Sequence, residues 1–187
     1  MSEKPPTKPI RRVALLRAVN VGGHGILKME SLRRAFLGLG FTDVRTLLQS
    51  GNVVYTAPGD EPEAAMAGRI EACLRETLGV ETTAILRTRR ELEKLVRRDP
   101  FGDEAAGRDV KKYVAFMVRK PKPGLTDPVL SAKDGLTLFS VEGREAFLLS
   151  ARVNGRYGFP NPFIETRLAV AATTRNWNTV VKLAETD

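Results

Sequence analysis

Apolar and polar residues follow two periods along the first half of the chain. Nearly continuous apolar runs are typical of buried strands, and apolar residues three and four positions apart predict amphipathic helices. The pair Ser50-Gly51 separates two strand-like segments and predicts a hairpin. In chain order we expect a strand over 10–19, a helix over 29–39, strands over 44–49 and 52–56, a helix over 61–78, a strand over 80–86 and a helix over 88–98.

The second half shows similar patterns. Asp127-Pro128 is a capping residue followed by proline, which predicts the start of a short helix. Glu142-Gly143 predicts a second hairpin, and Asn161-Pro162 predicts the start of another helix. The expected order is a strand over 113–118, the short helix, strands over 136–141 and 146–149, a helix over 161–168, a strand over 169–173, and a last helix whose buried face holds Trp177, Val180, Val181 and Ala184.

The two halves therefore share one predicted order of elements. This order favours an α+β fold of two tandem β-α-β-β-α-β halves, each ferredoxin-like, with mixed or antiparallel sheets. We expect the halves over residues 12–98 and 99–187, behind a disordered basic tail over residues 1–11. An internal duplication and a single irregular α+β domain both fit this pattern.

Composition narrows the class of protein. The chain has 187 residues, 42% hydrophobic and 28% charged, as in ordinary globular proteins. We expect no membrane segment, because no run approaches the roughly 20 apolar residues that a span requires. Cys73 is the single cysteine, so no internal disulfide can form, and the expected location is the cytoplasm. The net charge of +8 permits a nucleic acid or a small anionic ligand as partner without requiring one.

A glycine-rich turn, Gly22-Gly23-His24-Gly25, joins the first strand to the first helix. Phosphate-binding loops occupy such junctions, but neither G-x-x-x-x-G-K-[ST] nor G-x-G-x-x-G is present. His24 is the only histidine, so histidine-dependent catalysis would require it. The spacing of acidic residues, His24 and Cys73 matches no metal-ligand pattern, and we expect neither a metal nor a cofactor.

The predicted topology brings two turns to one edge of a sheet. In a ferredoxin-like unit the first two strands are parallel and the third lies between them, so both carboxyl ends meet at that edge. We therefore expect a ligand site there, and mutually satisfied loop hydrogen bonds are the alternative interpretation. The candidate ligand-binding residues are Arg17, Asn20, Gly22, Gly23, His24, Gln49, Ser50 and Asn52, together with Arg175 and Asn176 before the last helix.

Three segments occur in the order of a known family: LLRAVNVGGHGILKMESLR, GFTDVRTLLQSGNVVY and ATTRNWNTVVKL. From about residue 12 to the C-terminus, the chain resembles the mostly bacterial proteins of the domain of unknown function family sixteen-ninety-seven. That family typically has R-G-I-N-V-G-G, where this chain has Ala18 and Val19 in place of glycine and isoleucine. The resemblance implies an α+β fold and no particular activity.

Three functions fit these observations. The leading hypothesis is a non-catalytic cytoplasmic binding protein for an anionic ligand, with nucleic acid among the candidates. The second is a small-molecule enzyme that uses His24, Ser50 and Arg17 at the shared edge. The third is an interaction module that dimerises through an exposed sheet edge. The sequence does not decide whether the chain is an enzyme.

Overall fold

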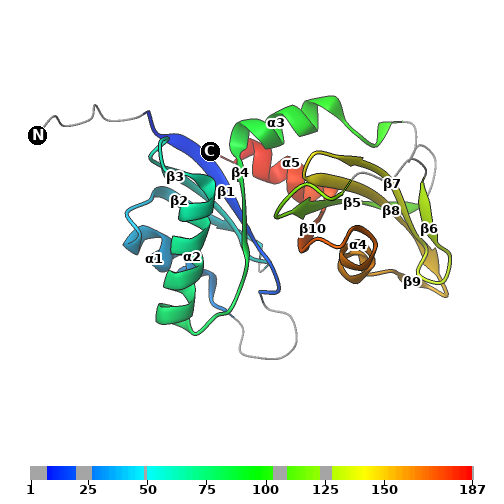
Figure 1. Cartoon of the computed structure of the whole chain (residues 1–187), viewed down its shortest axis with the longest axis horizontal. Coiled ribbons are helices and arrows are strands. Elements are labelled where there is room, and N and C mark those ends of the chain that lie inside the picture. The colour runs from blue at the N-terminus through cyan, green and yellow to red at the C-terminus, as the bar shows by residue number, and fades with distance from the viewer. Residues whose placement is uncertain (1–7, 20–26, 49, 103–108, 123–127, 187) are drawn as a thin grey trace, which may run out of the picture. The chain divides into compact units, whose positions relative to one another are not determined.

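The computed structural model describes residues 8–19, 27–48, 50–102, 109–122 and 128–186. These residues form two compact units, of which the first extends to Glu91 and the second runs from Leu92 to Glu185. Each unit is built on its own antiparallel sheet (Figure 1). The α+β fold class is therefore confirmed.

The first unit contains the predicted order of strand, helix, strand, strand, helix and strand. Its elements are β1 (Ile10–Leu16), α1 (Met29–Gly38), β2 (Thr42–Leu47), β3 (Asn52–Ala57), α2 (Glu63–Leu78) and β4 (Ala84–Thr88). The sheet order is β2-β3-β1-β4, and every neighbouring pair is antiparallel. As predicted, β3 lies between β1 and β2, so those two strands are parallel.

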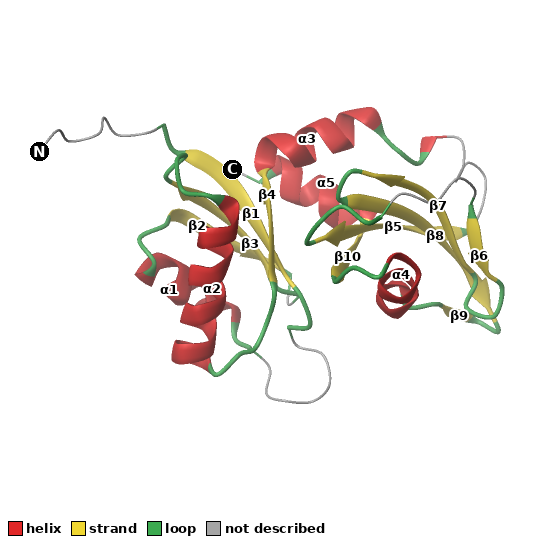
Figure 2. Ribbon diagram, viewed as in Figure 1, coloured by secondary structure: helices red, strands yellow, loops and turns green. Residues whose placement is uncertain are grey.

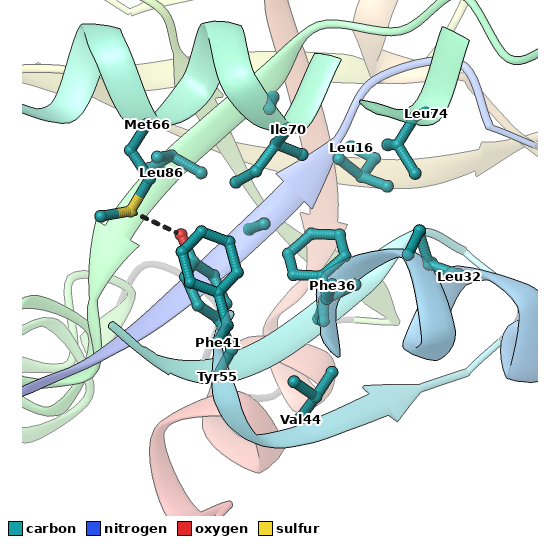
Figure 3. Close-up of a cluster of buried hydrophobic side chains, with 14 of the residues drawn as sticks. Leu16, Leu32, Phe36, Phe41, Val44, Tyr55, Met66, Ile70, Leu74 and Leu86 are labelled. Atoms are coloured by element: carbon teal, nitrogen blue, oxygen red, sulfur yellow. Dashed lines mark hydrogen bonds between the residues drawn. The ribbon is translucent and has the colours of Figure 1, made fainter. Parts of the chain in front are cut away.

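Both helices of the first unit pack on one face of this sheet, around three aromatic rings (Figure 3). The ring centroids of Phe36 and Tyr55 are 5.2 Å apart, and those of Phe41 and Tyr55 are 4.6 Å apart. The buried Tyr55 hydroxyl donates a hydrogen bond to Met66 Sδ at 3.2 Å, and burial raises the pKa of Tyr55. Cys73 packs partly buried against the same core, as a small apolar residue would.

The second unit has more strands than the first (Figure 2). Its elements are α3 (Arg89–Arg98), β5 (Val110–Met117), β6 (Val129–Ser131), β7 (Leu136–Glu142), β8 (Glu145–Val153), β9 (Arg156–Tyr157), α4 (Pro160–Leu168), β10 (Ala172–Asn176) and α5 (Trp177–Glu185). The boundary between the units falls within α3, whose first three residues belong to the first unit. The sheet order is β10-β5-β8-β7-β6, and β9 pairs with β8.

The core of the second unit has two parts. Ile164 of α4 packs on one of them, which is formed by apolar residues of β5, β7, β8 and β10. The other is an aromatic cluster around the fully buried Phe101, whose ring centroid lies 5.2 Å from Trp177, 5.6 Å from Phe139 and 6.0 Å from Phe147. Trp177 is therefore half-buried and packs on this cluster, and of the predicted helical face Val180 and Ala184 are buried, together with Leu183, which was not predicted.

The short helix predicted at Asp127-Pro128 is wrong. Pro128 leads directly into the strand β6, which pairs with β7 through Val129 and Leu138. Val129 also packs against the core of the unit. Pairing with β7 and burial of a β-branched residue outweigh the local capping signal, because both act through residues distant in sequence. The second unit therefore has a strand at the place where the first has a helix.

The strand predicted over 169–173 lies three residues later, as β10. Ala169 ends α4 in the left-handed conformation, at φ +51°. Two further residues, Val170 and Ala171, then precede the strand. The chain therefore needs the residues after Leu168 to turn from the helix into the sheet.

Candidate functional site

The structure places the end of β1 beside the β2–β3 hairpin. Leu15 faces Asn52 across the sheet, and the Leu16 amide donates a hydrogen bond to the Gly51 carbonyl at 2.8 Å. Five candidate residues at this edge, Asn20, Gly22, Gly23, His24 and Gln49, lie outside the described residues. The ligand site at this edge therefore remains a prediction, and the structure describes only Arg17, Ser50 and Asn52 of its candidate residues.

The hairpin is braced by its own side chains. Asn52 has no exposed surface, and its Nδ2 donates to the Leu47 carbonyl at 3.1 Å and to Ser50 Oγ at 2.8 Å. Gly51 has φ +70°, and a Cβ atom there would lie 3.0 Å from Leu16 Cβ. Asn52 therefore holds the turn in shape, and Gly51 allows it to approach β1 closely.

Arg17 leaves β1 beside the segment that precedes β4. Its backbone amide donates to the Thr83 carbonyl at 2.9 Å, and its carbonyl accepts a hydrogen bond from Thr82 Oγ1 at 2.7 Å. Thr82 and Thr83 were not among the predicted residues. Leu16 pairs with Ala84 in the antiparallel register of β1 and β4. This pairing brings Thr82 and Thr83, which precede Ala84, opposite Arg17.

The other two candidates, Arg175 and Asn176, lie on β10 in the second unit. Arg175 is 7% exposed, and its Nη1 donates to Thr173 Oγ1 at 2.7 Å and to the Thr174 carbonyl at 2.9 Å. Burial lowers the pKa of Arg175 to about 10. Asn176 Oδ1 accepts a hydrogen bond from the Asn178 amide at 3.0 Å, so it caps α5. These contacts support the fold.

A cationic surface that was not among the predicted sites runs along α3. Arg90, Lys94 and Arg97 are four and three positions apart and exposed, whereas Leu92 and Leu95 are buried. We call the three cations the α3 basic row. Within the described residues none of the three forms an ion pair. The signal was present in the sequence, since helical spacing alone aligns these residues on the face opposite the leucines.

Two neighbouring groups on α3 are already engaged in local contacts. Glu91 completes a capping box: its Oε2 accepts from the Thr88 amide at 2.6 Å, while its own amide donates to Thr88 Oγ1 at 3.2 Å. Arg98 pairs with Glu142 and lies over the ring of Phe147, with Cζ 5.6 Å from the centroid. The α3 basic row therefore lies on a capped helix that is held to the sheet at its end.

No group of three or more His, Cys, Asp or Glu side chains among the described residues is arranged to hold a metal ion. No described helix is long and apolar enough to cross a membrane.

Comparison with known proteins identifies a family and a shared fold. The family model described as "Protein of unknown function (DUF1697)" matches residues 10–147. No curated protein matches the chain. Among solved structures, the chain is similar to the conserved bacterial protein SP0830 from Streptococcus pneumoniae, with 18% identity and a TM-score of 0.64. The match covers 96% of this chain and 99% of that one, and it shows the fold alone.

Proposed function

Since the chain belongs to the DUF1697 family of proteins of unknown function, we propose its role from the geometry of this chain. We propose that the protein is a non-catalytic binding protein for an anionic ligand, and that nucleic acid is the ligand that the geometry favours. The observation that carries this proposal is the α3 basic row. The net charge of +8 supports it, because a cationic protein attracts polyanions over long range.

The α3 basic row has a length that suits a phosphate backbone. With a rise of about 1.5 Å per residue, Arg90 and Arg97 lie about 10 Å apart along the helix axis. One strand of a duplex places a phosphate about every 3.4 Å along its axis, so three steps cover the same length. Three cations at this spacing can neutralise neighbouring phosphates and release their counterions.

The described hydrogen bond to Ser50 in the hairpin is structural and does not support serine catalysis. Ser50 Oγ accepts a hydrogen bond from the amide of Asn52. An amide group cannot take up the hydroxyl proton, so this contact does not activate Ser50 as a nucleophile. The polar groups of the hairpin that the structure describes hold the turn in shape.

Dimerisation through the outer edge of the first sheet is disfavoured by β2. The pairing of β2 with β3 shifts register between Thr42 and Arg45. Asp43 lies in this irregular segment at φ +50°, and Arg45 is exposed. A bulge and charged residues on an outer strand are features that prevent edge-to-edge pairing.

The test compares two triple variants with equal loss of charge. Arg90→Gln/Lys94→Gln/Arg97→Gln removes the α3 basic row. The control removes three exposed cations of the second unit outside α3, with Lys120→Gln/Lys122→Gln/Lys133→Gln. Fluorescence anisotropy with labelled oligonucleotides, from 50 to 200 mM salt, measures affinity and its salt dependence.

We expect the row variant to lose at least tenfold in affinity, and its salt slope to fall by about 2 on a single strand, since each phosphate contact contributes about 0.7. The control should retain most of its affinity. Equal losses in both variants would assign the binding to net charge and overturn the role of the row. Wild-type protein that binds no oligonucleotide at 50 mM salt would overturn the function itself.

We also propose that the two units descend from an internal duplication of a ferredoxin-like unit, in which the second unit has the strand β6 in place of the first helix. The order β10-β5-β8-β7 corresponds strand by strand to β4-β1-β3-β2. Arg87 on β4 and Arg175 on β10 both precede the last residue of a strand that leads directly into a helix, and both are buried. Superposition of the units tests this proposal, which requires α2 to fall on α4 when the four corresponding strands are aligned.

A further inference from the structure

The β8–β9 hairpin lies at one end of the second sheet (Figure 2) and carries cationic and aromatic residues. Arg152 pairs with Tyr157 across the hairpin. The turn consists of Asn154 and Gly155, at φ +50° and +77°, the conformation that favours tight two-residue hairpins. A short, well-defined turn therefore fixes the positions of the side chains that flank it.

Tyr157 organises the cations around it. Lys111 Nζ lies 4.2 Å from the centroid of its ring, and Arg152 Cζ lies 5.0 Å from it. The Tyr157 hydroxyl donates to Asp109 Oδ1 at 2.9 Å and accepts from Arg152 Nη2 at 3.2 Å. Two positive charges, on Lys111 and Arg152, therefore lie around the ring that contacts the single carboxylate of Asp109, whereas Arg156 follows on the opposite face of the strand. The hairpin therefore keeps an excess of positive charge on a prearranged frame.

Phe159, two residues after Tyr157, provides an exposed aromatic ring. Its side chain is 66% exposed, and its backbone is extended, at φ −94° and ψ 113°. The preceding Gly158 lies so close to the β6–β7 turn that a Cβ atom would be 2.3 Å from the Asp134 carbonyl oxygen. Successive residues of an extended chain face opposite sides. Because Gly158 faces the β6–β7 turn, the side chain of Phe159 points to the opposite side, away from the turn.

We propose that this hairpin binds single-stranded nucleic acid, with the Phe159 ring stacked on a base and Arg152 and Lys111 in contact with phosphates. An exposed ring stacks on a base whose face is free, which a single strand offers and a duplex covers with neighbouring base pairs. Positive charge beside an aromatic ring matches the alternating phosphates and bases of such a strand. The inference rests on the proposed function for the class of ligand, and it adds the strandedness and a second contact site.

The test separates bases from phosphates. The probes are a labelled 15-nucleotide oligothymidine and an abasic oligomer of the same length, which carries the same phosphates. The protein variants are Phe159→Ala, Phe159→Trp and the control Leu130→Ala, which removes an equally exposed apolar side chain from the same unit. Anisotropy titrations on the full chain give the affinity of each variant for each probe, and circular dichroism verifies that each variant is folded.

We expect wild-type protein to prefer oligothymidine to the abasic oligomer by about 5- to 100-fold, the range that stacking on one base covers. Phe159→Ala should abolish this preference and leave affinity for the abasic oligomer unchanged, whereas Phe159→Trp and Leu130→Ala should retain it. Equal wild-type affinity for both oligomers would overturn the stacking site while the proposed polyanion binding stands. If the wild-type protein binds neither oligomer, both the stacking site and the proposed function are overturned. The same holds if the protein binds anionic lipid vesicles but neither oligomer.

Discussion

The close approach of Gly158 to the β6–β7 turn predicts that Gly158→Ala destabilises the second unit. The added Cβ atom would lie 2.3 Å from the Asp134 carbonyl oxygen and 3.0 Å from Leu136 Cγ. Real Cβ atoms essentially never approach another heavy atom within 3.0 Å, and the nearest atom belongs to the backbone. A rotamer change cannot relieve this overlap, so either the turn or the segment that carries Phe159 must move.

The magnitude follows from overpacking. Forcing an extra methyl group into a packed site typically lowers the free energy of unfolding by about 1–3 kcal/mol. We expect the upper part of this range, because a backbone oxygen has to move. The displacement also reaches Phe159, so Gly158→Ala should weaken the preference for oligothymidine together with the stability.

A second glycine in the first unit provides a control of opposite sign. Gly68 lies inside α2, and a Cβ atom there would meet nothing within 4 Å. Gly68→Ala should therefore stabilise the first unit by about 0.5–1 kcal/mol, since alanine loses less entropy in a helix. Urea unfolding separates the two effects, because the single tryptophan, Trp177, reports on the second unit and circular dichroism reports on both. A Gly158→Ala protein as stable as wild type would refute the packing argument.

Two further predictions concern the first unit. Ala18 has φ +59°, so Ala18→Gly should raise the free energy of unfolding by about 0.5–1 kcal/mol. The control Ala65→Gly in the helix α2 should lower the free energy of unfolding by about 1 kcal/mol. Urea unfolding in which both variants lose stability would contradict the left-handed conformation of Ala18. Burial raises the pKa of Tyr55 above 10.0, so above pH 10 the unfolded chain releases a proton that the folded chain keeps, and stability falls as pH rises. Tyr55→Phe should flatten this fall between pH 9 and 11, and an unchanged slope in unfolding titrations would contradict it.

The order of elements in the first unit could be predicted from the sequence, because its signals are local, although the strand predicted over 80–86 lies at Ala84–Thr88 and the one predicted over 10–19 ends at Leu16. The amphipathic helix α2 buries Met66, Ile70 and Leu74, the residues whose spacing predicted its inner face. The Thr88–Glu91 capping box likewise acts within four residues. Adjacent strands joined by a tight hairpin leave few alternative pairings, so the order of the sheet followed from the order of the elements.

The second unit contains the main error, because its deciding interactions are long-range. The strand β6 exists through its pairing with β7 and through the burial of Val129, and neither is visible in the residues around Pro128. The burial of Arg175 was equally hidden, since an arginine near a helix start is usually exposed. The Arg175 Nη1 atom donates hydrogen bonds to Thr173 Oγ1 and to the Thr174 carbonyl, both on its own strand.

Ala18 connects the family pattern to the candidate edge. Where the family typically has glycine, this chain has alanine, and the structure gives that position a positive φ. Glycine adopts this conformation without strain, so the pattern has a backbone reason at the point where β1 leads toward the predicted loop. Glycine at this position of the family pattern is therefore explained by the turn of the backbone, and it does not by itself indicate a ligand.

The two cationic surfaces differ in the physical origin of the affinity that we assign to them. Contacts of the α3 basic row release counterions, so their contribution falls steeply as salt concentration rises. Stacking of Phe159 on a base involves no charge on the ring and depends little on salt. The hairpin cations that contact phosphates contribute to the salt slope as well, so the slope reports on both surfaces. The preference for oligothymidine over the abasic oligomer reports on the hairpin alone, because the row contacts only phosphates. The two measurements together therefore distinguish the sites without relying on the relative position of the two units.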